Sequence, residues 1–187
     1  MIKIISIETF CNEFVGFVRI TDETGARGWG QVSTYHSDIT CQVLHRQVAP
    51  WVLGVEFSDL DDLLDLVTER EHKFPGSYLR RAIGGFDTAV WDLWGKQAGK
   101  PVVALLGGKP GKLRVYASSM KRDITPLEEA KRLIALQQKF GYDAFKVRAG
   151  AEVGRNKDEW PGRTEEIIPV MRKYLGDTSE LLIDANS

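Results

Sequence analysis

The sequence lacks an excess of charge of either sign. Its 187 residues include 25 Lys and Arg against 26 Asp and Glu, which gives a formal net charge of −1 at pH 7. No segment is rich in Lys or Arg, whereas proteins that bind nucleic acids or anionic membranes present a basic face that neutralises phosphates. We therefore expect neither a nucleic acid nor a membrane as partner.

Long apolar stretches are also missing. A helix that crosses a bilayer needs roughly 20 apolar residues, and the runs here extend for only a few. The first ten residues, MIKIISIETF, alternate in character and lack the apolar core and small-residue cleavage site of a signal peptide. The sequence predicts a cytoplasmic protein without a membrane span.

Cysteine is scarce, with only Cys11 and Cys41. Their spacing matches no metal-ligand motif, and in a reducing compartment we expect both to be packing thiols.

The composition, 43% hydrophobic and 27% charged, is typical of a globular protein with one or two domains.

The first half of the chain alternates and then changes to a helical period. Apolar residues predict strands near 2–5, 15–20 and 28–32, with a turn at 21–25 that ends in Gly25. Helical spacing follows over 39–50, over 60–67 behind the candidate cap Ser58, and over 77–98 behind the candidate cap Ser77. The pair Gly84 and Gly85 inside the last helix indicates that another backbone approaches closely.

The second half predicts the order β-α-β-α-β. A short buried strand at 113–117 follows a turn-rich boundary, and Thr125 and Glu128 form a capping box for a helix that Gly141 ends. A strand at 144–147, a helix at 165–175 and a strand at 181–184 complete the pattern. Strands that are apolar on both faces and joined by single helices predict a parallel sheet, as in a barrel or a doubly wound domain. Because no helix follows the last strand, we expect this chain to be the first half of a protein about twice as long.

Two cations lie near the end of one predicted strand. Lys146 and Arg148 are separated by one residue, so their side chains point to the same face. At the mouth of a parallel barrel such a pair would form an anion site for a substrate carboxylate. The alternative is that both side chains extend to solvent at the strand end.

An acid ends the next predicted strand. Asp184 follows Leu181 to Ile183, and Asn186 shares its face. A buried carboxylate needs a cation, and a divalent metal held by oxygen ligands is one candidate. The alternatives are that Asp184 caps the following helix or faces water.

Several longer motifs resemble one family. Residues 84–96 (GGFDTAVWDLWGK), followed by GKP at 99–101 and LLGG at 105–108, resemble the capping-domain helix and linker of the enolase superfamily, mandelate racemase/muconate lactonizing enzyme type. Residues 115–117 resemble its first barrel strand, 146–148 its second-strand K-x-K motif, and 184–186 its third-strand D-A-N motif. These segments span nearly all of the chain.

The resemblance implies a fold and a chemistry. The fold would be an α+β capping domain over 1–108, followed over 109–187 by the start of a modified TIM-type (β/α)₇β barrel. The family binds a divalent metal, usually Mg²⁺, which stabilises the enediolate formed when the proton α to a carboxylate is removed; such sites pair a Lys or His base with Mg²⁺. By resemblance, Asp184 matches the first metal ligand and Lys146 the first Lys of the motif, with the other acidic ligands beyond Ser187.

One position departs from the family pattern. Where racemases carry a second Lys as base, this chain has Arg148, whose guanidinium stays protonated and accepts protons poorly. This disfavours a two-base racemase and favours an acid-sugar dehydratase, in which Lys146 and Arg148 act on the carboxylate and on the departing hydroxyl. A racemase or epimerase of the same superfamily and a non-catalytic fragment or metal-free binding module are the alternatives.

Substrate contacts are expected from a loop and from a strand end. Residues 33–38 resemble a specificity loop of the capping domain, in which Tyr35 and His36 could bind substrate hydroxyls, as could Asn186; alternatively, Ser37 or Asp38 simply caps a helix there. The long loop 152–162 could line the barrel mouth or meet another subunit. The expected partners are a small-molecule carboxylate and further copies of the chain in a homo-oligomer.

Overall fold

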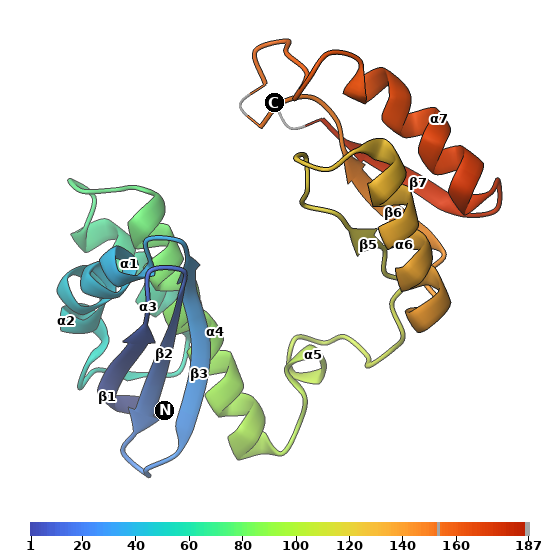
Figure 1. Cartoon of the computed structure of the whole chain (residues 1–187). Helices are drawn as coiled ribbons and strands as arrows, with labels where there is room; N and C mark the ends of the chain where they lie inside the picture. The colour runs from blue at the N-terminus through green and yellow to red at the C-terminus, as the bar shows by residue number, and fades with distance from the viewer. Residues whose placement is uncertain (153, 186–187) are drawn as a thin grey trace. The chain divides into compact units, whose positions relative to one another are not determined.

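The structure is a computed structural model that describes residues 1–152 and 154–185. It contains two compact units, Met1–Gly111 and Lys112–Ser187 (Figure 1). Within the described residues, no helix is both long and apolar enough to cross a membrane.

The N-terminal unit begins with an antiparallel meander. Strands β1 (Ile2–Cys11), β2 (Val15–Asp22) and β3 (Arg27–Thr34) pair in sequence order, and the short β4 (Glu56–Phe57) adds to the other edge of β1. The turn after β2 forms because the Asp22 carboxylate accepts hydrogen bonds from the amides of Thr24 and Ala26, and Gly25 adopts φ +84°. The three predicted strands and their turn are confirmed.

Helices cover one face of this sheet. A continuous helical run consists of α1 (Ser37–Val43), a π-helical segment (Leu44–Val48) and α2 (Ala49–Val52), so it passes through Pro50 instead of ending there. The run is followed by α3 (Leu60–Arg70), α4 (Ser77–Ala98) and the short α5 (Val102–Leu105). The helix predicted over 77–98 is confirmed as α4, and the apolar residues at helical spacing along it are buried: Leu79, Ile83, Phe86, Val90 and Leu93.

The long helix α4 lies directly against β3 because both elements carry glycine at the contact. A Cβ added to Gly28 would lie 2.0 Å from the carbonyl oxygen of Ala89, and one added to Gly30 would lie 2.0 Å from that of Gly85. On the helix side, a Cβ at Gly85 would lie 2.4 Å from Cγ1 of Val32. The predicted close approach is therefore confirmed at Gly85.

Two predicted helix caps are wrong by one residue. Asp59, not Ser58, caps α3, because its carboxylate accepts hydrogen bonds from the amides of Asp61 and Asp62, two free N–H groups of the first turn. Ser77 is the first residue of α4, and Gly76 occupies the cap position without a side-chain bond.

The C-terminal unit is a parallel β/α arrangement. Strands β5 (Ala117–Ser118), β6 (Ala144–Arg148) and β7 (Glu180–Asp184) lie side by side in that order. They are joined by α6 (Pro126–Phe140) and α7 (Arg163–Leu175), which lie together on the strands (Figure 1). The predicted capping box between Thr125 and Glu128 is present, and Gly141 ends α6 in the left-handed conformation.

The first strand of this unit is shorter than predicted. Only Ala117 and Ser118 pair with β6. The preceding apolar residues Leu113 and Val115 are 87% and 61% exposed, so the predicted buried strand over 113–117 is wrong for most of its length. The apolar pattern indicated burial, but no partner strand extends far enough in the described residues to pair with it.

Candidate functional site

Three charged side chains meet at the carboxyl ends of β6 and β7. The parallel register places Arg148 beside Asp184 and Lys146 beside Leu182. Lys146 Nζ lies 2.8 Å and Arg148 Nη1 3.0 Å from the same carboxylate oxygen, Asp184 Oδ2. The predicted common face of the two cations is therefore confirmed, and the cation partner that Asp184 requires is present on the neighbouring strand.

These side chains are partly withdrawn from solvent. The exposed fractions are 17% for the Lys146 side chain, 8% for Arg148 and 25% for Asp184. Arg148 Nη2 also lies 3.0 Å from the sulfur of Met120, in the segment after β5. The site thus combines residues that follow or end three adjacent parallel strands, which is where ligand sites lie in such folds.

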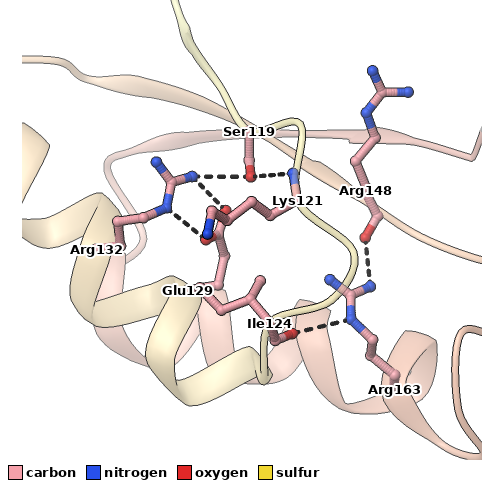
Figure 2. Close-up of polar contacts among 7 residues, drawn as sticks. All are labelled: Ser119, Lys121, Ile124, Glu129, Arg132, Arg148 and Arg163. Carbon is pink, nitrogen blue, oxygen red and sulfur yellow. Dashed lines mark hydrogen bonds and ion pairs between the residues drawn. The ribbon is translucent and has the colours of Figure 1, made fainter.

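A buried arginine supports the strand end from below (Figure 2). Arg163, at the start of α7, is fully buried and donates from Nη1 to the carbonyl oxygen of Arg148 at 2.9 Å and from Nε to that of Ile124 at 3.3 Å. Burial lowers the pKa of Arg163 from its ordinary value, although the nearby carboxylates of Asp158 and Glu129 act in the opposite direction. The Arg148 side chain extends away from Arg163 in Figure 2. Arg163 thus binds the backbone of Arg148, while the Arg148 guanidinium contacts Asp184.

A second polar cluster holds the segment after β5 (Figure 2). Glu129 on α6 is 1% exposed and accepts two hydrogen bonds of 2.8 Å from Arg132. Arg132 also donates to the hydroxyl oxygen of Ser119 at 2.9 Å, and this oxygen accepts a further bond from the amide of Lys121. The Ser119 amide in turn donates to the carbonyl oxygen of Lys146. The cluster ties α6 to the strand that carries both candidate cations.

Side chains of Asp158 and Thr164 connect the end of the long loop, the start of α7 and the residues after β6. The Asp158 carboxylate accepts hydrogen bonds of 2.7 Å from the amide and the hydroxyl of Thr164, and the Thr164 hydroxyl oxygen accepts one from the Gly150 amide. Burial raises the pKa of Asp158, but the bonds from Thr164 outweigh it and the net pKa is lowered. The loop therefore closes back onto the end of β6.

The donor set of this site fits a metal in part. Asp184 supplies a hard carboxylate oxygen of the kind that Mg²⁺ prefers. Among residues 1–152 and 154–185, no group of three His, Cys, Asp or Glu side chains converges to hold a metal ion. The described residues can therefore supply one acidic ligand and two cations for a metal-bound carboxylate, and further ligands would have to come from elsewhere.

Tyr35 and His36 lie in the N-terminal unit, between β3 and α1. Both adopt the left-handed conformation, with φ 56° and 49°, which is uncommon outside glycine and concentrates at functional positions. Tyr35 is 68% exposed, and its ring meets the ring of Phe14 edge-on. His36 is the N-cap residue of α1 but makes no side-chain cap bond, so neither Ser37 nor Asp38 caps this helix.

The sequence did not reveal several supporting residues. Arg163 follows a glycine in a charged segment and carries no motif that predicts full burial. Glu129 and Arg132 are three residues apart, a spacing that predicts an ion pair on one face of a helix. The predicted contact residue Asn186 lies outside the described residues.

The two units define a class of protein. An α+β unit with an antiparallel sheet precedes the first strands of a parallel β/α unit, whose strand ends carry an acid and two cations. This order of elements is that of a protein in which an α+β domain precedes a parallel β/α barrel, whose ligand sites lie at the carboxyl ends of the strands.

The family model of the mandelate racemase/muconate lactonizing enzyme N-terminal domain matches residues 3–107. The chain belongs to this family, within the enolase superfamily, and consists of its capping domain and the start of its barrel.

Individual relatives agree with this assignment. A D-galactonate dehydratase family member of Paenibacillus sp. is 33% identical over 138 residues, covering 72% of this chain and 33% of the relative. The structure of a candidate racemase from Roseobacter denitrificans has a TM-score of 0.95 and 73% identity, covering 99% of this chain and 50% of that one. A magnesium complex of a family protein from Paracoccus denitrificans has a TM-score of 0.82 and 29% identity, covering 100% and 52%. The chain thus spans between 33% and 52% of the length of these proteins.

Proposed function

We propose that the protein containing this chain is a Mg²⁺-dependent hydro-lyase that dehydrates a sugar acid. It removes the proton α to the carboxylate and expels the β-hydroxyl as water, which gives a 2-keto-3-deoxy acid. The observation that carries the proposal is the convergence of Lys146 and Arg148 on Asp184, with arginine in the second cation position.

Arginine in this position argues for a one-sided reaction. A racemase must remove a proton from one face of the substrate and return it to the other, which requires a base on each side. The Arg148 guanidinium stays protonated and donates hydrogen bonds only. It is suited to bind a carboxylate or to donate a hydrogen bond to a departing hydroxyl, while the base belongs to a later strand.

The roles of the described residues follow from their charges. Asp184 would hold Mg²⁺, which when bound supplies positive charge to the substrate carboxylate and lowers the cost of the negative charge that develops there. Lys146 and Arg148 would exchange part of their contact with Asp184 for the substrate carboxylate. Both then stabilise the charge that appears when the α-proton leaves.

Tyr35, His36 and Asn186 are proposed substrate contacts that select among sugar acids through their hydroxyls. The exposed ring of Tyr35 supports its part in this role. In the intact enzyme, Tyr35→Phe is expected to raise KM for the preferred sugar acid several-fold with little change in kcat. An unchanged KM would remove Tyr35 from the substrate contacts.

The reaction type is tested by turnover in heavy water. The intact enzyme is incubated with D-galactonate and other aldonates, and the products are followed by NMR and by a 2-keto-acid assay. We expect a 2-keto acid as product. The remaining substrate should not contain molecules that carry deuterium at the α-carbon and have the inverted configuration. Inversion without loss of water would refute the dehydratase assignment.

The metal assignment is tested by direct binding. In the intact protein, Asp184→Asn should lower Mg²⁺ affinity by at least tenfold, because a charged oxygen ligand is lost. Asp143→Asn is the matched control, since Asp143 is an exposed acid that precedes β6 and pairs with Arg114. Equal Mg²⁺ affinity of the two variants, measured by calorimetry, would remove Asp184 from the metal site.

A racemase or epimerase is the second candidate. It is favoured by the 73% identity to the Roseobacter denitrificans protein described as a candidate racemase. In that case the same heavy-water experiment yields deuterated substrate of inverted configuration, and Lys146 becomes the candidate base on one face of the substrate.

A further inference from the structure

The only two cysteines of the sequence meet in the N-terminal unit. Cys11 ends β1 and pairs directly with Gly16 of β2, and paired residues project to the same face of a sheet. A Cβ added to Gly16 would lie 3.3 Å from Sγ of Cys41. The Cys41 sulfur therefore lies, together with Ser37 and Val32, against the space that the missing Gly16 side chain leaves, and it interacts with the Cys11 side chain.

Contacts on both sides hold this arrangement in register. The Thr9 hydroxyl lies 2.9 Å from Nε2 of His45, and the Ser37 hydroxyl donates to the carbonyl oxygen of Asn12 at 2.8 Å. Cys11 lies between Thr9 and Asn12 in the sequence, just as Cys41 lies between Ser37 and His45. The helical run is thus fixed along the end of β1 at both neighbours of the cysteine pair.

The two thiols differ in access to solvent. Cys11 is exposed, whereas Cys41 is 3% exposed. Burial raises the pKa of Cys41 to about 11; interactions with the Cys11 thiol and with Asp38 add to this increase, and Thr9 opposes it. At neutral pH Cys41 is protonated and shielded, so Cys11 is the sulfur that meets an oxidant first.

We propose that Cys11 and Cys41 form a reversible disulfide, a redox modification site in the N-terminal unit whose oxidant is a small disulfide such as oxidised glutathione. The Cys11 thiolate attacks one sulfur of the oxidant and releases one glutathione thiol, which leaves a mixed disulfide on Cys11. Cys41 then loses its proton and attacks the Cys11 sulfur, releasing the second glutathione thiol. Two protein thiols are oxidised and one small disulfide is reduced to two thiols.

The bond would join the end of β1 to α1, the helix that follows the strained turn at Tyr35 and His36. It closes a loop of about 30 residues, and disulfides that close such loops stabilise the folded state because they restrict the conformations of the unfolded chain. Oxidation is therefore expected to raise the Tm of this unit by about 10 °C. The site uses none of the residues assigned above to the metal or the substrate carboxylate.

The chain of residues 1–187 is reduced, treated with oxidised glutathione and examined by intact mass, thiol counting and peptide mapping. We expect a monomer that has lost two hydrogen atoms and both free thiols, and that yields a Cys11–Cys41 cross-linked peptide. Dithiothreitol should cleave this cross-link and restore both thiols. A lasting glutathione adduct on Cys11 with Cys41 still free would overturn the proposal, as would a disulfide between two chains.

Two single variants separate the roles of the thiols. Cys41→Ser should keep glutathione on Cys11 because the resolving thiol is gone, and Cys11→Ser should react at least tenfold more slowly with oxidised glutathione than wild type because Cys41 is buried. Circular dichroism of the reduced proteins checks that both variants fold. If Cys11→Ser reacts as fast as wild type, Cys41 is the accessible thiol and the proposed order is wrong.

Discussion

Adjacent glycines in α4 offer a matched test of the packing in the N-terminal unit. Gly84 is exposed, and a Cβ added there meets nothing within 4 Å. A Cβ added to Gly85 lies 2.4 Å from Cγ1 and 2.8 Å from Cα of Val32. The two substitutions thus have the same helical context and opposite tertiary surroundings.

The magnitudes follow from two terms. Alanine stabilises a helix interior by about 1 kcal/mol relative to glycine, so Gly84→Ala should raise the free energy of unfolding by that amount. Gly85→Ala has the same gain, but it overpacks a strand backbone that cannot turn away, at a cost of about 3 kcal/mol. The net effect at Gly85 is a loss of about 2 kcal/mol, and the variants differ by about 3 kcal/mol.

Urea unfolding of both variants and wild type, followed by circular dichroism, measures these differences. The order of midpoints should be Gly84→Ala, wild type, Gly85→Ala. If Gly85→Ala is as stable as Gly84→Ala, then α4 does not lie against β3 in the described way, and the role given to the glycines of this interface is wrong.

Three further predictions concern local features. Asp59→Ala should lower the free energy of unfolding by about 1 kcal/mol while Ser58→Ala stays within about 0.5 kcal/mol, and equal thermal melts would contradict the cap assignment. Hydrogen bonds from Thr125 lower the pKa of Glu128. This capping interaction therefore stabilises the folded state at pH values above the pKa that Glu128 has in the unfolded chain, and the stabilisation is lost as the pH falls through the pKa in the folded chain. Thr125→Ala should raise the pKa of Glu128 measured by NMR titration, and an unchanged pKa would refute the interaction between the two side chains. Arg163→Met should destabilise the C-terminal unit by about 2–3 kcal/mol, because the buried carbonyl of Arg148 and the partly buried carbonyl of Ile124 lose their donor. Unchanged hydrogen exchange in β6 would show that these carbonyls have other partners.

Local features were predictable where neighbouring residues decide the conformation. The capping box at Thr125, the left-handed Gly141 and the turn ending in Gly25 depend on contacts within a few residues, and the structure has all three. At the start of α3, two adjacent residues could both cap. Only the backbone geometry selected Asp59 over Ser58.

The candidate site was predictable in part. Strand alternation places Lys146 and Arg148 on one face from their spacing alone. That Asp184 lies beside Arg148 depends on the register between two strands. This register depends on the packing of α6 and α7 on the sheet. The contact of both cations with one carboxylate oxygen of Asp184 therefore could not be predicted from the sequence of either strand.

Tertiary structure alone decided the contacts between segments that are distant in the chain. Gly28 and Gly30 have no feature in the sequence that separates them from other strand glycines. The structure shows that the backbone of α4 lies against them and leaves no room for a Cβ atom. Arg163 is fully buried because it finds the carbonyls of Ile124 and Arg148, and a buried guanidinium is tolerated only where such acceptors exist. Most elements, the capping box at Thr125 and the faces of the strand side chains follow from the sequence alone, because they depend on local hydrogen bonds and periodicity. The cap residue of α3, the length of β5, burial, strand register and the choice of partner required the folded chain, because they depend on backbone geometry and on which surfaces exclude water together.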